Sequence, residues 1–374
     1  MKSFEFIPGF IDIEDGSGTF SVKLNVADGA SGIKYLSLWV TSPAGKHAAA
    51  ASLWEFTGSD TNRIYKESFT VNKFLDPGKY TVTVELTDNA GNTGYYDLNT
   101  FLRVTNGADG FADGRSYYIG ASSSLTSRYD DLYLSGKGDF LGRGNSADNR
   151  LFGNLGDNKL FGLDGNDRLT GGYGNDILIG GNDADRLIGG DGNDTASYQG
   201  ASGAVIASLE DHRLNTSDAT GDLYFSVENL VGSSFADRLA GDTAVNAITG
   251  AAGNDTLIGG VGADKLYGGA GADTFAFRSQ GESTLAVRDT IYDFSRVGGD
   301  KIDLSAIDAD ANGAADQAFT FIGTNAFSGV AGELRYVKRV GDTFVNGDVN
   351  GDGVIDFSVR LDDPIDMRAP DFLL

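Results

Sequence analysis

Carboxylate and amide side chains recur at a strict nine-residue spacing in two stretches of the sequence. In the first stretch, six consecutive units begin at Gly144 and carry at their sixth position Asn149, Asn158, Asp167, Asp176, Asp185 and Asp194. In the second stretch, five units begin at Gly232 and carry at the same position Asp237, Asn246, Asp255, Asp264 and Asp273. Carboxylate and amide oxygens are ligands of hard cations, and a fixed period places them at equivalent points of a repeated structure. The spacing therefore predicts a row of cation sites.

Glycine begins every one of these units and often fills the second and fourth positions as well. Glycine adopts a positive φ without steric cost, and the lack of a Cβ lets the carbonyl groups of a turn point toward one spot. The turn glycines that we expect to line the cation sites are Gly165, Gly172, Gly174, Gly190, Gly192, Gly253, Gly260, Gly262, Gly269 and Gly271. Each unit is thus predicted to form a six-residue turn followed by a three-residue strand.

The eighth position of the units is always apolar. Its residues are Leu151, Leu160, Leu169, Leu178, Leu187, Ala196, Leu239, Ile248, Leu257, Leu266 and Phe275. A flexible acidic linker has no reason to keep an apolar residue in this register, whereas a strand that faces a core does. Two units form one coil with a turn on each side, so the turns of units n and n+2 stack along the axis of a parallel β-roll.

Stacking of alternate turns predicts seven calcium sites between position-six residues. The pairs are Asn149 with Asp167, Asn158 with Asp176, Asp167 with Asp185, Asp176 with Asp194, Asp237 with Asp255, Asn246 with Asp264, and Asp255 with Asp273. Calcium accepts six to eight oxygen ligands in flexible geometry, whereas magnesium demands a tighter octahedron and keeps its waters. The pairs that contain asparagine lack one charge and are expected to bind more weakly.

The sequence is predicted to be all-β, with the repeats forming a central domain over residues 131–276. The two repeat blocks span residues 144–197 and 232–276, and residues 198–231 break the nine-residue phase between them. This interruption either caps one block or bridges to the next. Residues 277–374 are expected to form a further β-rich domain.

The first 105 residues alternate apolar and polar side chains between Gly-, Asp- and Asn-rich turns. Strands are expected at residues 18–27, 33–41, 48–56, 65–71, 80–87 and 95–104. This number of strands predicts an antiparallel sandwich with Trp39, Trp54, Tyr80, Val82 and Val84 in its core. Residues 77–94 are similar to the closing strands of bacterial Ig-like domains. Residues 106–130 are rich in Gly, Ser and Asp and are expected to form a linker.

Composition restricts the partners of the protein. Aspartate supplies 44 of the 53 acidic residues, and the formal net charge is −24. This charge argues against nucleic acids and anionic membranes as partners. The absence of cysteine excludes disulfides, thiolate zinc sites and a cysteine nucleophile. No stretch is apolar enough to span a membrane, and the first ten residues lack the continuous apolar segment of a secretory signal.

From about residue 144 onward the sequence resembles secreted bacterial proteins of the RTX (repeats-in-toxin) family. After the repeats, several segments resemble the C-terminal domain of serralysin-type proteins; these are GGAGADTFAF, DTIYDFSRVGGDKIDLSAIDA, DQAFTFIG, AGELRY, GDVNGDGVIDF and APDFLL. The resemblance implies a calcium-loaded β-roll, the type I secretion machinery as a partner, and a location outside the cell or at its surface. In that family an uncleaved export signal lies at the C-terminus, and Asp371 followed by Phe372, Leu373 and Leu374 resembles its acidic-then-apolar ending.

Two further loops space oxygen ligands as an EF-hand does. Asp348, Asn350, Asp352 and Asp356 occupy positions 1, 3, 5 and 9, with Gly353 at position 6, but position 12 is Val359 rather than Glu. The loop is therefore either a calcium site or a solvated Asp turn between strands. Asp308, Asp310, Asn312 and Asp316 repeat the spacing around Gly313, also without the distal Glu.

Catalytic motifs are missing from the sequence. The zinc protease motif His-Glu-x-x-His is absent, since His47 and His212 are the only histidines and neither has a partner four residues away. No Gly-x-Ser-x-Gly elbow occurs either. The leading interpretation is a non-catalytic calcium-binding protein whose N-terminal domain mediates adhesion by binding an extracellular protein or glycan. The alternatives are a hydrolase of a polysaccharide or other polymer, with a carboxylate pair in the N-terminal region, and a structural surface-layer or matrix component.

Overall fold

The computed structural model describes the backbone of strands between residues 5 and 113, then residues 116–134, 136–310 and 317–374. Side chains are described for Tyr117 and, from residue 120 onward, for the same ranges. Within these residues the chain is all-β apart from three 3-10 helices, η1 (His212–Leu214), η2 (Ser217–Ala219) and η3 (Ala369–Asp371). None of the helices in the described part is long and apolar enough to cross a membrane. The chain divides into two compact units, residues 1–142 with 153–156, and residues 143–152 with 157–374.

Before residue 106, the part of the chain that the structure describes contains eight strands. They are β1 (Glu5–Phe6), β2 (Phe10–Asp12), β3 (Ser17–Val26), β4 (Ile33–Thr41), β5 (His47–Leu53), β6 (Arg63–Asn72), β7 (Gly78–Asp88) and β8 (Thr93–Thr105). One sheet has the order β1-β3-β6 and another has the order β2-β8-β7-β4-β5. The bounds of β3 to β8 agree within a few residues with the six strands that alternation predicts. The pairing of β2 with β8 is parallel, which an all-antiparallel arrangement does not contain.

The Ig-like sandwich itself stays a prediction. Its expected core of Trp39, Trp54, Tyr80, Val82 and Val84 falls outside the residues whose side chains the structure describes. The segment expected as a linker contains β9 (Phe111–Asp113), β10 (Ser116–Ile119) and β11 (Ser123–Ser124). Strand β10 pairs in parallel with β12 (Asp131–Leu134), Tyr117 lying opposite Leu132. Regular parallel pairing therefore begins within the segment predicted to be a linker.

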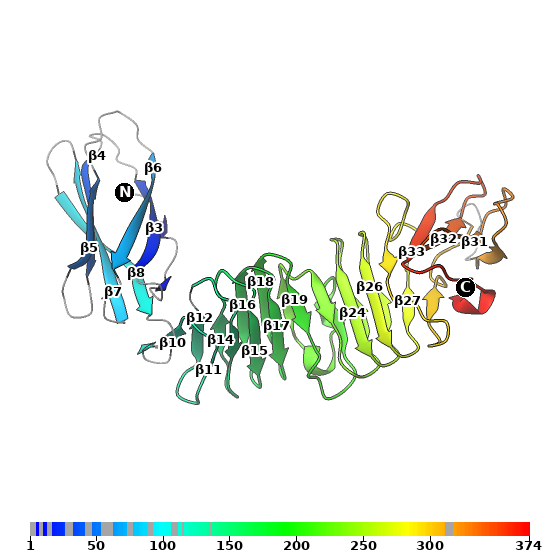
Figure 1. The fold of residues 1–374 in the computed structure, drawn as a ribbon, viewed down its shortest axis with the longest axis horizontal. Helices are drawn as coiled ribbons and strands as arrows, with labels where there is room; N and C mark the ends of the chain where they lie inside the picture. The colour runs from blue at the N-terminus through cyan, green and yellow to red at the C-terminus, as the bar shows by residue number, and fades with distance from the viewer. Residues whose placement is uncertain are drawn as a thin grey trace. The chain divides into compact units, whose positions relative to one another are not determined.

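Short strands at nine-residue intervals build the roll. Strand β13 (Leu141–Arg143) directly precedes the first block, which contains β14 (Arg150–Phe152), β15 (Lys159–Leu163), β16 (Arg168–Tyr173), β17 (Ile177–Gly181), β18 (Arg186–Asp191) and β19 (Thr195–Ser197). The second block contains β23 (Arg238–Ala240), β24 (Ala247–Ala252), β25 (Thr256–Ile258), β26 (Lys265–Ala270) and β27 (Thr274–Ala276). Figure 1 shows the strands from β14 to β27 following one another within the second unit.

Each strand pairs in parallel with the strand two units further on. Leu160 lies opposite Leu178 in the β15–β17 pair, and Leu169 lies opposite Leu187 in the β16–β18 pair. The offset is 18 residues, the length of the predicted coil. Alternate strands therefore form separate sheets, which confirms the parallel β-roll.

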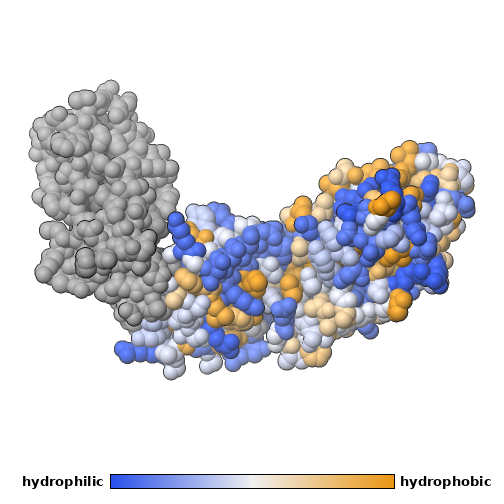
Figure 2. All heavy atoms as spheres, viewed as in Figure 1, coloured by the Kyte–Doolittle hydropathy of each residue, from blue (hydrophilic) through white to orange (hydrophobic). Residues whose placement is uncertain are grey.

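The interior of the roll is made by the eighth position of the units. All eleven residues at this position are 0 or 1% exposed. The exposed hydrophobic residues, such as Val261 and Val354, are scattered over the surface, where hydrophobic and hydrophilic atoms mix (Figure 2). Burial of one apolar side chain per unit supplies the hydrophobic stabilisation that short three-residue strands cannot provide by hydrogen bonding alone.

The interruption at residues 198–231 acts differently in the two sheets. Its strands are β20 (Ile206–Ser208), β21 (Leu223–Phe225) and β22 (Asn229–Val231). Strand β22 pairs with both β19 and β24, so one sheet continues without a break. In the other, β21 pairs with β18 and ends that sheet, while β20 pairs with β23 and begins a new one. The interruption therefore bridges on one side of the roll and caps on the other.

The C-terminal residues extend both sheets of the second block. The strands are β28 (Thr290–Ile291), β29 (Lys301–Asp303), β30 (Thr320–Gly323), β31 (Glu333–Lys338), β32 (Thr343–Asp348), β33 (Phe357–Leu361) and β34 (Phe372–Leu373). One sheet continues in the order β26-β28-β33-β32-β31-β30, and the other in the order β27-β29-β34. Residues 157–374, which include most of the roll and all the C-terminal strands, lie in one compact unit, and the boundary expected at residue 276 stays a prediction.

Candidate calcium sites of the roll

The structure brings together all seven predicted pairs of position-six residues. In each pair the backbone N–H of the earlier residue donates a hydrogen bond to Oδ1 of the later aspartate, with N···O distances of 2.7 to 2.9 Å. One oxygen of each carboxylate thus fixes the stacking of two turns. This contact also fixes where the second oxygen lies.

The second oxygen of these aspartates is buried and has no hydrogen-bond donor. It is Oδ2 of Asp167, Asp176, Asp185, Asp194, Asp255, Asp264 and Asp273. A buried acceptor without a partner costs about 1–3 kcal/mol, and more if it is charged. Because this cost recurs in successive coils, we expect a cation to bind at these oxygens.

The first glycine of each unit leaves space for this oxygen. A Cβ at Gly162 would lie 2.2 Å from Oδ2 of Asp167 and 2.5 Å from the carbonyl oxygen of Gly180. At Gly171 the corresponding distance to Oδ2 of Asp176 is 2.1 Å. A carboxylate oxygen and a carbonyl oxygen of the next coil therefore converge on a space that only glycine keeps open, which explains why every unit begins with glycine.

The turn glycines predicted as site residues adopt the expected backbone conformation with one exception. Nine of the ten have a positive φ, from 93° at Gly269 to 156° at Gly192, whereas Gly262 does not. Leu163, Asp183 and Ala251, which replace glycine at the second or fourth position, are also held at positive φ. The repeat geometry is therefore imposed even where the side chain opposes it.

Burial raises the pKa of the aspartates at position six from Asp167 to Asp194 and from Asp255 to Asp273 in the absence of a metal. Desolvation is the largest cause, and neighbouring carboxylates add to it. The pKa rises from 3.8 to about 7 for Asp167 and Asp176, and to about 9 for Asp185. The site disfavours a carboxylate charge unless a cation balances it.

The donor set suits calcium. Within the described residues, no group of three or more acidic or histidine side chains is placed to hold a metal ion. The oxygens that each pair of stacked turns offers are those of one or two position-six carboxylates and of the backbone carbonyl groups. Such an all-oxygen set with few charged members fits calcium, which accepts carbonyl ligands readily.

Asparagine at position six behaves differently from aspartate. Oδ1 of Asn149 accepts a hydrogen bond from the backbone N–H of Asn145, and Oδ1 of Asn246 accepts one from that of Asp242. Asp237 also departs from the pattern, because the backbone and hydroxyl groups of Ser233 donate to its carboxylate. These turns satisfy their own polar atoms, which supports the prediction of weaker sites at asparagine positions.

Four acidic residues outside the repeats continue the same contacts. The backbone N–H groups of Asp185, Asp194, Asp264 and Asp273 donate to Asp222, Glu228, Asp289 and Asp300 respectively, at 2.8 to 3.0 Å. Asp289 alone among these four also has a buried, unpartnered Oδ2. Asp222 and Asp300 satisfy both oxygens, through the Tyr198 hydroxyl and the Ser295 backbone N–H.

Sequence reasoning missed these four residues because no glycine-rich turn precedes them at the repeat period. The signal that could have found all four is an acid followed two residues later by an apolar or aromatic residue that pairs with a position-eight residue. The acids Asp222, Glu228, Asp289 and Asp300 precede Tyr224, Leu230, Ile291 and Ile302, which lie opposite Leu187, Ala196, Leu266 and Phe275.

The EF-hand-like loop is hydrogen bonded internally. Asp348 is fully buried, and its carboxylate accepts hydrogen bonds from the backbone N–H groups of Asn350, Gly351 and Gly353. Asp356 accepts one from the backbone N–H of Val349, and Asn350 accepts one from that of Asp352. This network favours the Asp turn over a calcium site. Of the second loop, Asn312, Gly313 and Asp316 lie outside the described residues, and Oδ1 of Asp308 accepts from the backbone of Asp310 and Gln317.

The position of His212 fits no triad. This residue is exposed in η1, between Asp211 and Arg213, which form an ion pair with each other. The side chain of His47 lies outside the described residues. The position-six carboxylates are engaged in stacking the turns of the roll.

Comparison with known proteins agrees with this geometry. Residues 143–172 and 161–196 match the RTX calcium-binding nonapeptide repeat, and residues 225–373 match the serralysin C-terminal domain of peptidase family M10. Neither is a catalytic domain. No curated protein sequence matches the chain.

Among solved structures, the extracellular lipase LipA from Serratia marcescens is similar at 16% identity and a TM-score of 0.22. The similarity covers 68% of this chain and 45% of the lipase, so the chain spans less than half of that protein. RTX repeats and serralysin C-terminal domains mark bacterial proteins that leave the cell by type I secretion. The chain is therefore a secreted, extracellular calcium-binding protein that carries RTX repeats followed by a serralysin-type C-terminal domain.

Proposed function

We propose that the roll is a folding switch that stays open in the calcium-poor cell and closes when calcium binds outside it. The observation that carries this proposal is the buried, unpartnered Oδ2 atom repeated in successive turns. Without a cation, the stacked carboxylates repel each other and pay the cost of desolvation. Bound calcium supplies the positive charge that these oxygens coordinate.

The seven predicted pairs are the proposed sites, and the contact between Asp264 and Asp289 adds an eighth. The pairs that begin at Asn149, Asn158 and Asn246 are proposed to fill last, because each lacks one carboxylate charge. The ligands in each turn are the position-six side chain and the carbonyl groups of the turn glycines. At the millimolar calcium of an extracellular module, all-oxygen sites of this kind bind and fold together.

Calcium titration of the full-length protein tests this proposal. Circular dichroism should show a gain of β structure on addition of calcium, and isothermal titration calorimetry should show several ions bound per chain. Magnesium at the same concentration should give a much smaller change. A spectrum and a melting temperature that are indifferent to calcium would contradict the switch.

The export signal is proposed to lie in residues 371–374, as the resemblance implies. In the folded chain these residues are not free, since Phe372 is 5% exposed and β34 pairs with β29. The signal would therefore be readable only before the roll and the C-terminal sheets form. This is compatible with export of an unfolded chain followed by folding outside.

We further propose that the N-terminal region is an Ig-like sandwich that binds an extracellular protein or glycan without catalysis. The strand bounds of β3 to β8 support a β domain there. Binding of the full-length protein to cells or a glycan array, compared with a variant that lacks residues 1–105, tests this role. Equal binding by both would contradict it, turnover of a polymer substrate would favour the hydrolase alternative, and self-association would favour a matrix component.

A further inference from the structure

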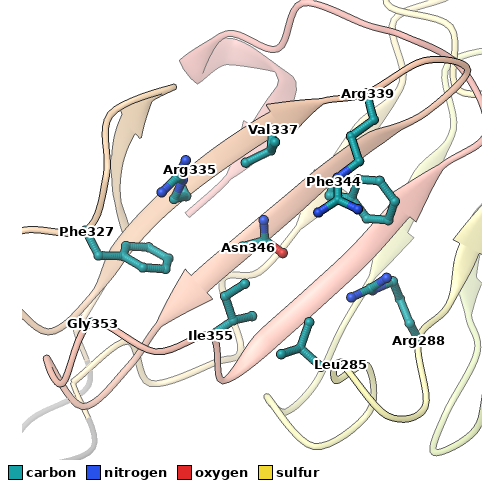
Figure 3. A pocket seen from close by; sticks show the side chains of 10 residues that line it. All are labelled: Leu285, Arg288, Phe327, Arg335, Val337, Arg339, Phe344, Asn346, Gly353 and Ile355. Carbon is teal, nitrogen blue, oxygen red and sulfur yellow. The ribbon is translucent and has the colours of Figure 1, made fainter.

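Three arginines surround a cavity on one face of the sheet formed by β31, β32 and β33. The cavity has a volume of about 270 Å³, and Arg335 lines it from β31, Arg339 from the turn directly after β31, and Arg288 from the other side (Figure 3). We call it the arginine groove. No ion pair involves these three side chains among the described residues, although the chain as a whole carries a net charge of −24. A cationic groove without counter-charges on an acidic protein suggests an anionic ligand.

The groove is held in place by its neighbours. The guanidinium groups of Arg288 and Arg339 lie 4.9 and 5.1 Å from the ring centre of Phe344, and that of Arg335 lies 5.5 Å from the ring centre of Phe327. Such cation–π contacts restrict the arginines without neutralising them. The guanidinium charges are therefore fixed before a ligand arrives.

A buried network further orients the donors. Nε of Arg288 donates to Oγ of Ser358 at 2.9 Å, and this hydroxyl donates to Oδ1 of Asn346 at 2.8 Å. The acceptor of the Asn346 amide is thereby used, which leaves its NH₂ group as a donor on a side chain that is only 4% exposed. Nε of Arg335 is buried and has no acceptor. The polar lining thus consists of donors, so the ligand must supply acceptors.

The charges around Arg288 also favour an anionic ligand in the arginine groove. Desolvation lowers the pKa of Arg288, and the positive charges of Arg339 and Arg360 lower it further. Carboxylates do not appear among these causes, and the nearby Asp342 is paired with Arg360. An oxyanion in the groove would relieve the repulsion among the arginines.

We propose that the arginine groove binds the carboxylate groups of an acidic polysaccharide. Guanidinium forks match carboxylates bidentately. Arg335 lies within β31 and Arg339 directly follows its last residue, so the two guanidinium groups enter the groove at different points along its length. Val337 and Ile355 supply an apolar surface in between. Charges separated in this way fit a chain that carries acids at intervals, with sugar C–H faces over the apolar residues.

Other anionic polymers fit less well. An extended peptide would need acceptors for its N–H groups, which the donor lining does not offer, and the groove lies on the face of the sheet rather than at an edge where strand addition occurs. An acidic glycan is also a polymer that a secreted protein meets outside the cell.

Calorimetry on the full-length protein in saturating calcium tests the proposal, with oligogalacturonate as the ligand and its methyl ester as the neutral counterpart. The acid should bind and the ester should not. Each of Arg288→Gln, Arg335→Gln and Arg339→Gln should weaken binding about tenfold or more, as expected for a lost charge-assisted hydrogen bond. Arg213→Gln, which removes an exposed arginine elsewhere in the same unit, should leave the affinity unchanged.

Arg339 is exposed, so its variant is expected to fold normally, and a calcium-loaded melting curve checks all four variants. Equal binding of acid and ester would overturn the proposal. So would unchanged binding by the three groove variants, which is the result expected if calcium ions merely bridge the glycan to acidic residues.

Discussion

Asparagine and aspartate make different contacts at position six of the repeats. The side-chain oxygen of Asn246 accepts a hydrogen bond from the backbone N–H of Asp242, whereas Oδ2 of Asp176 accepts none. An uncharged amide can satisfy itself within its own turn. Coils with asparagine are therefore able to close with fewer cations, and coils with aspartate depend on them.

The first residue-scale prediction concerns Gly171. A Cβ at this position would lie 2.1 Å from Oδ2 of Asp176, so Gly171→Ala should displace the carboxylate and abolish one calcium site. Calorimetry should show one ion fewer per chain, with a lower calcium-loaded melting temperature. Gly200→Ala is the matched control, since nothing lies within 4 Å of its Cβ. Full calcium stoichiometry in Gly171→Ala would show that the carboxylate is not a ligand.

The second prediction concerns a residue held against its preference. Ala251 occupies the second position of its unit with φ at 83°, where an L-residue is strained by about 1 kcal/mol. Ala251→Gly should therefore raise the free energy of unfolding of the calcium-loaded protein by several tenths of a kcal/mol to about 1 kcal/mol. Ala252→Gly, at an ordinary φ in the same strand, should lower it, and urea denaturation distinguishes the two. A lower stability for Ala251→Gly would mean that strain at this position is negligible.

Residue types predicted the core better than they predicted the details of the sites. The apolar eighth position needs only the period to be recognised, and every one of its residues is buried. The Ser233 hydroxyl that binds Asp237 could not be foreseen, because serine at a glycine position reads as a simple replacement. The distance between stacked coils decides which oxygen of a carboxylate accepts a hydrogen bond from the backbone. No local sequence pattern indicates this distance.

At the scale of elements, the interruption shows what periodicity cannot settle. Strands β18 and β21 pair with an offset of 37 residues instead of 18, because η1, η2 and β20 lie in the loop between them. The nine-residue phase is lost in the sequence, yet the register of the core is kept as Leu187 lies opposite Tyr224. The sequence alone shows that the nine-residue phase breaks. Only the pairing of β20 and β22 shows that one sheet continues through the break while the other ends and a new one begins.

The ladder of sites is expected to continue beyond the repeats at Asp289. Burial and the Asp264 carboxylate raise its pKa to about 9, and its Oδ2 is unpartnered. Asp289→Asn should reduce the calcium stoichiometry by one ion and make the calcium-free protein more stable, because a buried charge is removed. Asp218→Asn, at a partly exposed residue in η2, serves as control. Unchanged calorimetry for Asp289→Asn would limit the sites to the repeats.

The last strand links folding to export. Deletion of residues 371–374 should retain the protein in the cell if they form the signal, and should lower the melting temperature because Phe372 packs against Phe321 at 5.1 Å between ring centres. Ile302 lies opposite Phe372 in the β29–β34 pair. Ile302→Ala should lower the free energy of unfolding by about 2–5 kcal/mol but leaves the tail intact. Export measured in culture medium should persist in Ile302→Ala and be lost in the deletion. Loss in both would mean that folding, not the tail, limits secretion.

At the scale of the whole molecule, the net charge of −24 describes the chain without calcium. Seven ions bound in the repeats would add 14 positive charges and bring the total to about −10, and the eighth at Asp289 would bring it to about −8, near the range of ordinary soluble proteins. The excess acid is thus concentrated where ions are proposed to bind. The arginine groove stands apart from this pattern as a local positive site within an acidic protein.

The final prediction follows from the raised pKa values and concerns the calcium-free protein. Folded carboxyls with pKa values of about 7 for Asp167 and about 9 for Asp185 bind protons more tightly than unfolded ones at 3.8. Between pH 4 and 9 the folded state therefore holds more protons, so the free energy of unfolding falls as pH rises through this window.

In the presence of a calcium chelator, circular dichroism should accordingly show more β structure near pH 5 than near pH 8. Saturating calcium should remove most of this difference, because the cation replaces the protons and releases them on binding. Proton release can be measured by repeating the calorimetric titration in buffers of different ionisation enthalpy. A calcium-free roll that is better folded at pH 8 than at pH 5 would mean that its position-six carboxylates are solvated, and the buried oxygens would then give no reason for a cation.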